Sequence, residues 1–478
     1  MKSRKENFTG NKLNRRGFFR SVTGAAGALS LTTAGCATGS QRKATAAPGH
    51  YRENARDIPL HTGDDVIVCG AGPAGVSAAI AAARTGAVTR LIDVNGCLGG
   101  VWTAGLLAWI FDFDKPGLTK EIIRRLDARN ARREERFNRF TYEPEEMKVL
   151  LEEMCEEAGV HVRLHTRVTA AYKKGRRLET VVTESKSGRE AWQAQQFIDA
   201  TGDGDLGALS GCGWDLGNPE TETCQPLTLN VLAAVKDINL LKPYISGGDL
   251  SGHVESTKLI KNEIKRAGFN PSYGMPTIFH IRDNIVLLMF NHEYGVRPDD
   301  ADAMTAATLH ARKEVFSIMR GLRKLGGPWQ KLQLVSSAEH IGIRDGRRIH
   351  GLYTVTKKDL ENGRRHADSV ARVTFGVDIH AFTHEKNEIE TIGRGGIKQF
   401  HPYDIPLRAL IARDVDGLMT AGRCISGDFV AHASYRVTGN SVATGEATGT
   451  VAALAADRKT LPQNIAWKDA AKRIAQDS

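Results

Sequence analysis

The stretch Asp65-Val66-Ile67-Val68-Cys69-Gly70-Ala71-Gly72-Pro73-Ala74-Gly75 decides the fold of this chain. A short β-branched run breaks into the spacing Gly-x-Gly-x-x-Gly and continues into an alanine-rich segment, 76–83, which predicts a strand, a tight turn and a helix. Gly70 permits the turn, Gly72 lets the backbone approach a pyrophosphate, and Gly75 lets the helix pack close to the strand. The free N–H groups and positive dipole end of this helix would then face the phosphates.

A second predicted strand, 89–92, ends in Asp93, about 20 residues beyond the glycines. A carboxylate at that position accepts hydrogen bonds from an adenosine ribose. A lone Gly-x-Gly-x-x-Gly is weak evidence, but strand, glycines, helix, second strand and terminal acid in this order predict a dinucleotide site. The alternative is a glycine-rich turn in an ordinary βαβ unit.

Length and composition indicate an ordinary globular chain of several domains. There are 478 residues, of which 41% are apolar and 25% charged, with a formal net charge of +10. The first 35 residues alone carry +6, which leaves +4 for the remainder. We find no long basic run with interleaved aromatic residues in that remainder, so nucleic acid is not expected as a partner.

Residues 1–35 have the features of an export signal. Asn14-Arg15-Arg16-Gly17-Phe18-Phe19-Arg20 resembles the twin-arginine motif, and the apolar segment 22–34 is too short and too polar to span a bilayer. Thr33-Ala34-Gly35-Cys36 resembles a bacterial lipoprotein cleavage box, although Thr33 departs from the usual branched aliphatic residue. The resemblance implies twin-arginine export of a folded protein to the periplasm, with a lipid anchor to a membrane at Cys36. A soluble exported protein cleaved nearby is the alternative.

The cysteines beyond Cys36 show no Cys-x-x-Cys spacing. We therefore expect neither a zinc site nor a redox dithiol, and no metal. Cys69 and Cys424 stand in apolar, glycine-flanked contexts and are predicted to be buried small hydrophobes.

Three further segments distinguish FAD from NAD as the dinucleotide. They are Gly96-Cys97-Leu98-Gly99-Gly100, then Phe197-Ile198-Asp199-Ala200-Thr201-Gly202-Asp203-Gly204-Asp205, and Gly417-Leu418-Met419-Thr420-Ala421-Gly422-Arg423-Cys424, which precedes a helical stretch at 441–456. Each has small residues that let backbone lie against a large flat ligand. A simple NAD-binding domain completes its site in one contiguous unit, whereas these pieces come from distant parts of the chain.

Together these segments resemble the glutathione-reductase-like superfamily, in its group of FAD-dependent oxidoreductases with a single Rossmann domain. The resemblance covers residues 64–458, including the segments 341–349 and 377–380, with Asp93 where glutamate is usual. It implies an α/β fold, in which a Rossmann-type FAD-binding domain is assembled from discontinuous segments and carries an inserted α+β substrate domain. A second Gly-x-Gly-x-x-Gly flanked by strand and helix is missing, so the flavin is expected to exchange electrons with a small molecule, oxygen, a quinone or a redox protein.

The resemblance also implies a division of the chain and a set of cofactor contacts. The predicted parts are the signal (1–35), a flexible tether (36–60), the first part of the FAD-binding domain (61–215), the substrate domain (216–400) and the C-terminal part of the FAD-binding domain (401–478). The residues expected to bind FAD are Gly70, Gly72, Pro73, Ala74, Gly75, Asp93, Gly99, Gly100, Val168, Ala200, Thr201, Gly202, Gly422, Arg423, Ser441, Val442 and Ala443.

Periodicity predicts several elements outside the cofactor segments. They are a helix over 145–160, strands over 162–168, 178–184 and 285–291, and a helix from 298 to 325 with Asp299 as its N-cap. Four aromatic residues, Trp102, Trp109, Phe111 and Phe113, form a cluster that is expected to be core rather than a substrate platform.

The catalytic candidates are His432, Arg436 and His380. His432 is the expected general base, because an unperturbed imidazole titrates near working pH, and Arg436 would hold an oxygen or carboxylate of the substrate. Asn291 and His292, at the end of a substrate-domain strand, are further candidates. The amides at the start of the helix near Asn440 would face the flavin pyrimidine ring.

The favoured function is hydride transfer between a small-molecule C–OH substrate, with sugars and polyols considered, and flavin N5, in a dehydrogenase or oxidase. A reductase of activated C=C bonds is one alternative, kept open by Arg344, Arg347 and Arg436. A non-catalytic flavin-binding electron carrier is the other. The long insert at 216–400 favours an enzyme, because a carrier needs no substrate domain.

Overall fold

The structure is a computed structural model that describes residues 51, 53–135, 139–246, 253–389 and 392–477. Residues 57–478 form one compact unit, and residues 1–56 are assigned to another. The predicted twin-arginine motif, the cleavage box and Cys36 lie outside the described residues. Within the described ranges, no helix combines the length and the apolar character that crossing a membrane requires.

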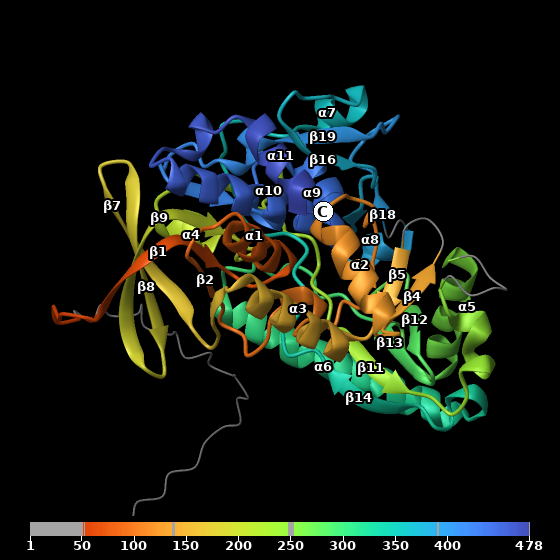
Figure 1. Ribbon diagram of the computed structural model, residues 1–478. Helices are drawn as coiled ribbons and strands as arrows, with labels where there is room; N and C mark the ends of the chain where they lie inside the picture. Colours follow the sequence, from red (N-terminus) through yellow and green to blue (C-terminus); the bar gives the residue numbers. More distant parts are fainter. Residues whose placement is uncertain (1–50, 52, 136–138, 247–252, 390–391, 478) are drawn as a thin grey trace, which may run out of the picture. The chain divides into compact units, whose positions relative to one another are not determined.

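A seven-stranded sheet carries the glycine-rich turn (Figure 1). Its strands are β1 (Leu60–Cys69), β2 (Thr89–Ile92), β6 (His161–Arg163), β7 (Arg167–Lys174), β8 (Arg177–Ser185), β9 (Gly188–Asp199) and β20 (Leu418–Thr420). The order is β6-β2-β1-β9-β8-β7, and β20 also pairs with β9. Strands β6, β2, β1, β9 and β20 are parallel, whereas β8 is antiparallel to both β9 and β7. This arrangement confirms the expected α/β fold with discontinuous cofactor segments.

The parallel strands end together at one edge of the sheet. Cys69 pairs with both Ile92 and Asp199, and Asp199 pairs with Thr420. The turns that follow these strands therefore all begin at the same edge, although they lie far apart in the sequence. This edge, at the carboxyl ends of parallel strands, is where open α/β sheets bind their ligands.

Two helices pack against each other beside the sheet, α1 (Pro73–Arg84) and α10 (Thr438–Asp457) (Figure 1). Glycines of α10 make this close approach possible. A β-carbon at Gly445 would lie 2.1 Å from the Ala74 oxygen, and one at Gly449 would lie 2.0 Å from the Ala78 oxygen. The small residues of the predicted helical stretch 441–456 thus serve helix packing, and they hold the amino end of α10 next to the glycine-rich turn.

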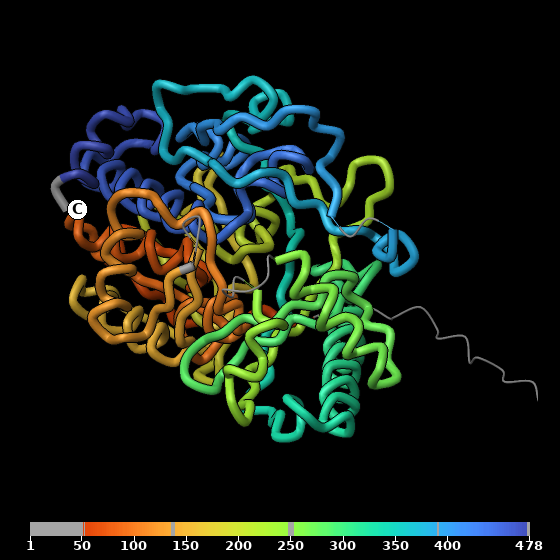
Figure 2. Tube along the Cα trace, turned by 90° about the vertical axis from the view of Figure 1, so that its right-hand side faces the viewer, coloured from red at the N-terminus to blue at the C-terminus, as the bar shows by residue number. Residues whose placement is uncertain are grey.

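A second, four-stranded antiparallel sheet forms within the predicted insert (Figure 1). Its residues belong to the green part of the trace in Figure 2. It has the order β12 (Thr277–Arg282), β13 (Ile285–Met289), β11 (Val231–Ala234) and β14 (Gln333–Ser337). Helices α5 (His253–Arg266) and α6 (Ala301–Leu325) share its apolar core, which includes Ile260, Leu288 and Val315.

Two sequence-based expectations about these elements were wrong. The N-cap of α6 is Asp300, which accepts hydrogen bonds from the amides of Asp302 and Ala303, whereas Asp299 forms an ion pair with Arg297 instead. The predicted strand 162–168 is two strands, β6 and β7. Between them the chain turns toward the β2 loop, because the Thr166 amide bonds to the Asp93 oxygen.

The remaining elements are mostly short. The strands are β3 (Trp109–Ile110), β4 (Arg132–Glu135), β5 (Arg139–Tyr142), β10 (Trp214–Asp215), β15 (Arg348–Ile349), β16 (Ser369–Val373), β17 (Ile379–His380), β18 (Ile392–Gly393) and β19 (Tyr403–Pro406). The helices are α2 (Leu118–Ala128), α3 (Pro144–Ala158), α4 (Asp205–Leu209), α7 (Lys357–Asn362), α8 (His384–Ile389), α9 (Phe429–Tyr435) and α11 (Trp467–Asp477).

Candidate active site

A cavity of about 1350 Å³ runs from the carboxyl edge of the parallel sheet to the antiparallel sheet. At one end it is lined by the turns after β1, β2, β9 and β20. At the other it is lined by Phe279 of β12 and Met289 of β13, together with the segments 342–344 and 375–380. The cavity therefore joins the predicted cofactor segments to the predicted substrate domain.

The glycine-rich turn is shaped to receive a phosphate group. Gly70 has a φ of 97°, which disfavours any residue with a side chain. A β-carbon on Gly72 would meet nothing within 4 Å, so this position opens onto the cavity, and Pro73 begins α1 directly after it. A β-carbon on Gly75 would lie 1.7 Å from the Gly70 oxygen, so Gly75 serves the packing of helix on turn.

Asp93 is buried at the start of the loop after β2 and lines the cavity. Its carboxylate accepts hydrogen bonds from the amides of Ala71 and Asn95, the latter at 2.7 Å. Each carboxylate oxygen has a further lone pair, so a ribose hydroxyl can still donate to it. Asp93 thus also holds the glycine turn in place, a role that its position in the sequence did not reveal.

Most residues expected to bind FAD line the cavity. They are Gly70, Gly72, Pro73, Ala74, Asp93, Gly100, Val168, Ala200, Thr201, Gly202, Gly422, Arg423 and Ser441. The structure places Gly75, Gly99, Val442 and Ala443 elsewhere. Gly99 donates its amide to the Ala71 oxygen inside the turn, and Val442 is buried in α10.

The described residues fit FAD. Backbone without side-chain obstruction lies at Gly72, a carboxylate lies at the ribose position, and the amino end of α10 presents Val437, Thr438 and Ser441 to the same cavity. The positive end of α10 suits the pyrimidine edge of a flavin, which carries negative charge when reduced. When bound, FAD would supply the two-electron acceptor or donor of the reaction.

Five polar residues, which we call the polar end, line the cavity together: Tyr273, Arg344, Asp378, His380 and Arg436. His380 Nε2 lies 3.3 Å from Asp378 Oδ2. Arg436 Nη2 donates to the same carboxylate oxygen at 3.2 Å and to the Asp378 carbonyl oxygen at 2.9 Å. Arg344 Nη1 donates to the Pro226 carbonyl oxygen at 2.8 Å and to Thr228 Oγ1 at 2.7 Å.

Burial and mutual charge set the protonation states of the polar end. Burial lowers the pKa of His380 to about 4, with Arg344 and Arg436 adding to the shift and Asp378 opposing it. Burial also lowers the pKa of Arg344 to about 10. Although burial acts in the opposite direction, His380 and Arg436 hold the pKa of Asp378 well below its usual range. At neutral pH, His380 is therefore neutral beside an ionised Asp378.

His432 does not belong to this group. Its side chain in α9 is completely buried, it does not line the cavity, and its ring nitrogens have no hydrogen-bond partner among the described residues. Its Nδ1 lies 3.9 Å from Asp345, and its ring stands edge-on to Tyr435. Because α9 turns His432 inward while Arg436 emerges after the helix ends, His380 and Arg436 meet in the cavity and His432 does not.

The predicted aromatic cluster divides between core and cavity. Trp102 and Phe113 are buried core residues, as expected, whereas Trp109 and Phe111 line the cavity. Trp109 stacks on Phe279 at a centroid distance of 4.5 Å, and Phe111 stacks on Phe375 at 4.6 Å. We call Trp109, Phe111, Phe279 and Phe375 the aromatic wall. Phe375 stands three residues before Asp378, so the wall adjoins the polar end.

Sequence reasoning missed Tyr273, Asp378 and the aromatic residues of the insert as cavity residues. Asn291 and His292, which it did single out, are buried and do not line the cavity, and His292 packs on Tyr273 at a centroid distance of 3.9 Å. The Asp-Ile-His spacing of 378–380 was the available signal for Asp378. No local pattern marked Tyr273 or Phe279.

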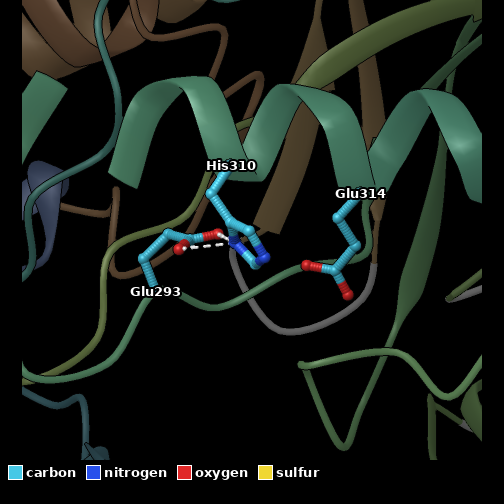
Figure 3. Close-up of side chains that lie close together, drawn as sticks. All are labelled: Glu293, His310 and Glu314. Carbon is cyan, nitrogen blue, oxygen red and sulfur yellow. Dashed lines mark hydrogen bonds and ion pairs between the residues drawn. The ribbon is translucent and has the colours of Figure 1, made fainter. Parts of the chain in front are cut away.

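Glu293, His310 and Glu314 form a cluster of polar side chains outside the cavity lining (Figure 3). His310 Nδ1 lies 3.0 Å from both Glu293 carboxylate oxygens, and the Glu314 carboxylate accepts from the amide and hydroxyl of Ser272. Three ligand atoms of metal-binding types are thus close together, but each carboxylate already has protein partners. We assign this cluster to tethering α6 to the segments that carry Tyr273 and His292.

The cysteines of the described chain are free thiols. Cys69 and Cys424 are fully buried, as expected for small hydrophobes in the sheet and the following turn. Burial raises the pKa of both thiols, so neither is a thiolate at neutral pH.

Comparison with solved structures gives distant similarities. A geranylgeranyl bacteriochlorophyll reductase-like protein from Thermoplasma acidophilum is 13% identical, with a TM-score of 0.43, over 87% of this chain and 84% of that one. The flavin-dependent brominase Bmp2 is 12% identical, with a TM-score of 0.43, over 87% and 83%. The p-nitrophenol 4-monooxygenase PnpA from Pseudomonas putida DLL-E4 is 11% identical, with a TM-score of 0.38, over 61% and 70%.

No curated protein matches this chain. The family model described as FAD dependent oxidoreductase matches residues 65–474, which begin in β1 and end in α11. This match spans the glycine turn, the insert with the antiparallel sheet, and α10. The chain therefore belongs to the FAD-dependent oxidoreductase family, and FAD is its cofactor.

Proposed function

We propose that this enzyme oxidises a small-molecule C–OH group, with hydride transfer from the substrate carbon to N5 of the flavin and proton transfer from the hydroxyl to His380. The observation that carries the proposal is the pairing of a neutral His380 with an ionised Asp378 in the cavity wall. A positioned imidazole is the commonest acid–base group in enzymes.

His380 and Asp378 have complementary parts in this reaction. Asp378 accepts the Nε2 proton of His380, which leaves Nδ1 as the unprotonated ring nitrogen. Nδ1 is buried and has no hydrogen-bond partner among the described residues, so in this proposal the substrate hydroxyl must contact it directly. The imidazolium that results lies beside the Asp378 carboxylate, which stabilises it. Arg436 keeps that carboxylate in position through its two hydrogen bonds.

Anaerobic reduction of the FAD-loaded enzyme tests the proposal. With a panel of hydroxy compounds, including sugars, polyols and hydroxy acids, a substrate should bleach the flavin absorbance. His380→Gln should leave the flavin spectrum unchanged and slow bleaching by about 10²- to 10⁴-fold. His432→Gln is the matched control, because this second buried histidine lies outside the cavity, and its rate per bound FAD should be unchanged. Equal rates in all three proteins would refute the role of His380.

Reduction of an activated C=C bond is a second candidate, favoured by the presence of Arg344 and Arg436 beside His380. In that direction the same residues would deliver a proton to the substrate instead of removing one. Reoxidation of the photoreduced enzyme by unsaturated carboxylates, without bleaching by any hydroxy compound, would establish this direction. We also propose that the chain belongs to the glutathione-reductase-like superfamily and that the insert is the substrate domain. The flavin would exchange electrons with oxygen, a quinone or a redox protein.

Export by the twin-arginine route to the periplasm, with a lipid anchor at Cys36, is also proposed. It is supported by the motif Asn14 to Arg20 and by Thr33-Ala34-Gly35-Cys36. This route carries folded proteins, and FAD binding assembles segments from both ends of the enzyme. Loading FAD in the cytoplasm before transport is consistent with that requirement.

A further inference from the structure

The polar end of the cavity holds more positive charge than the protein neutralises. Arg344 and Arg436 bring two guanidinium groups, and Asp378 is the carboxylate that pairs with Arg436. Asp345 also interacts electrostatically with Arg436, but it forms an ion pair with Arg348 at 3.2 Å. His380 and His292 are neutral, because burial lowers the pKa of both. The polar end therefore has a net charge of one positive unit.

The surplus charge is centred on Arg344. Its two hydrogen bonds go to neutral acceptors, the Pro226 carbonyl oxygen and Thr228 Oγ1, and no carboxylate of the described residues lies within ion-pair distance. Both bonds use Nη1, so the guanidinium is held in one orientation while its other donors remain for a ligand. Arg344 is half-buried, and a guanidinium withdrawn from water without a counter-ion is costly, so a ligand anion would relieve that cost.

Two other arginines that line the cavity differ in this respect. Arg347 pairs with Asp205 at 2.8 Å, and Arg423 pairs with Asp203 at 2.8 Å. Both are therefore neutralised by the protein, in the part of the cavity formed by the segment after β9. Within the polar end, Arg344 is the arginine without an ion-pair partner among the described residues, and it lies beside the proposed acid–base group.

The aromatic wall adds a second recognition feature next to this charge. Trp109, Phe111 and Phe375 are each partly exposed and line the cavity, and Phe279 completes the stacked set. Stacked rings of this kind offer a flat apolar surface to a flat apolar group. A sugar or polyol would leave Arg344 without an anion and would place hydroxyl groups against the rings.

We propose that the substrate of this enzyme carries a carboxylate, which binds Arg344 and Arg436, and a flat apolar group, which lies on the aromatic wall. The inference rests on the proposed function in one respect, that the substrate binds in this cavity. An aromatic hydroxy acid combines the carboxylate, the flat group and the oxidisable C–OH. Arg344 is then a specificity-determining residue, and neutral sugars are poor ligands.

Binding of unreactive probes to the FAD-loaded enzyme, measured by isothermal titration calorimetry, tests this inference without turnover. The probes are 3-phenylpropanoate, its neutral counterpart 3-phenylpropanamide, and propanoate, which keeps the charge and lacks the ring. We expect 3-phenylpropanoate to bind at least about tenfold more tightly than either of the others, because it alone engages both features. Similar affinity for the acid and the amide would overturn the proposal.

Variants of Arg344 and Trp109 show which residues cause the preference for 3-phenylpropanoate. Arg344→Met should reduce the preference for 3-phenylpropanoate over the amide by about ten- to a hundredfold, the usual worth of a hydrogen bond to a charged group. Arg347→Met is the matched control, since the same substitution removes a guanidinium that Asp205 already pairs, and the preference should persist. Trp109→Ala should weaken 3-phenylpropanoate and leave propanoate unchanged.

Two outcomes would count against the inference. If Arg344→Met keeps the wild-type preference, the carboxylate is bound elsewhere. If Arg344→Met and Arg344→Lys both lose FAD, the surplus charge serves the cofactor or the fold. Failure of His380→Gln to slow flavin bleaching would contradict the proposed acid–base role alone, because probe binding requires no proton transfer.

Discussion

His380 Nε2 lies 3.3 Å from Asp378 Oδ2, inside a cavity that also contains the cofactor turns. The two residues are separated by one position in the sequence, and the contact between carboxylate and imidazole is of the kind that orients an imidazole for proton transfer. Arg436, from a segment more than 50 residues later, donates to the same carboxylate oxygen. The pairing makes the protonation of His380 depend on Asp378.

The first prediction concerns the pH dependence of flavin reduction. His380 must be neutral to accept a proton, so the rate should fall on the acid side as pH drops through its pKa, about 4 in the free enzyme. The Asp378 charge raises that pKa, so Asp378→Asn should move the acid limb to still lower pH while slowing the reaction at neutral pH. Stopped-flow reduction over pH 3.5–8 measures both effects. An acid limb that moves to higher pH in Asp378→Asn would contradict the assignment of His380 as the proton acceptor.

The second prediction compares two glycines of the turn. Gly72→Val should give a folded protein without FAD, because the added side chain meets open space in the protein and occupies the position of a phosphate. Gly75→Ala should lower the stability itself, by about 1–3 kcal/mol, because its β-carbon would lie 1.7 Å from the Gly70 oxygen. FAD content and thermal unfolding of the two variants separate these effects. Normal FAD content in Gly72→Val would exclude the phosphate site.

The third prediction concerns the contact between Glu293 and His310. The hydrogen bond to Glu293, with its charge, raises the pKa of His310 above the ordinary value. This stabilisation is fully present below the unfolded-state pKa of about 6.5 and is lost as pH rises through the folded-state pKa. The melting temperature should therefore fall between pH 6.5 and 8.5 in the wild type, and His310→Gln should flatten that dependence. An NMR titration of His310 with an ordinary pKa would contradict the pairing.

The fourth prediction concerns location. Replacing Arg15 and Arg16 together by lysine should trap an FAD-loaded precursor in the cytoplasm, because the export motif needs both arginines. Cys36→Ala should be exported but released from the membrane, since the residue that would carry the lipid is missing. Fractionation and immunoblotting of cells expressing each variant check both outcomes. Normal export of the double lysine variant would show that the signal has been misidentified.

The amino-acid sequence by itself determined the cofactor half of the molecule. Strand, glycine turn, helix and terminal acid follow one another within 29 residues, from Asp65 to Asp93, and local sterics decide each of them. The helices over 145–160 and 441–456 and the buried Cys69 and Cys424 were predictable for the same reason. The capping of α6 was not, because the neighbouring Asp299 and Asp300 compete and Arg297 decides between them.

Only the tertiary structure decided which residues line the substrate part of the cavity. His432 and His380 look alike in the sequence, but α9 turns the first into the core, while β17 presents the second to the cavity. Arg344 and Arg347 stand three residues apart, but Asp205 and Asp299 lie within ion-pair distance of the second, and no carboxylate of the described residues does so for the first. Such differences depend on which distant segment supplies a counter-charge, and local sequence patterns carry no information about that pairing.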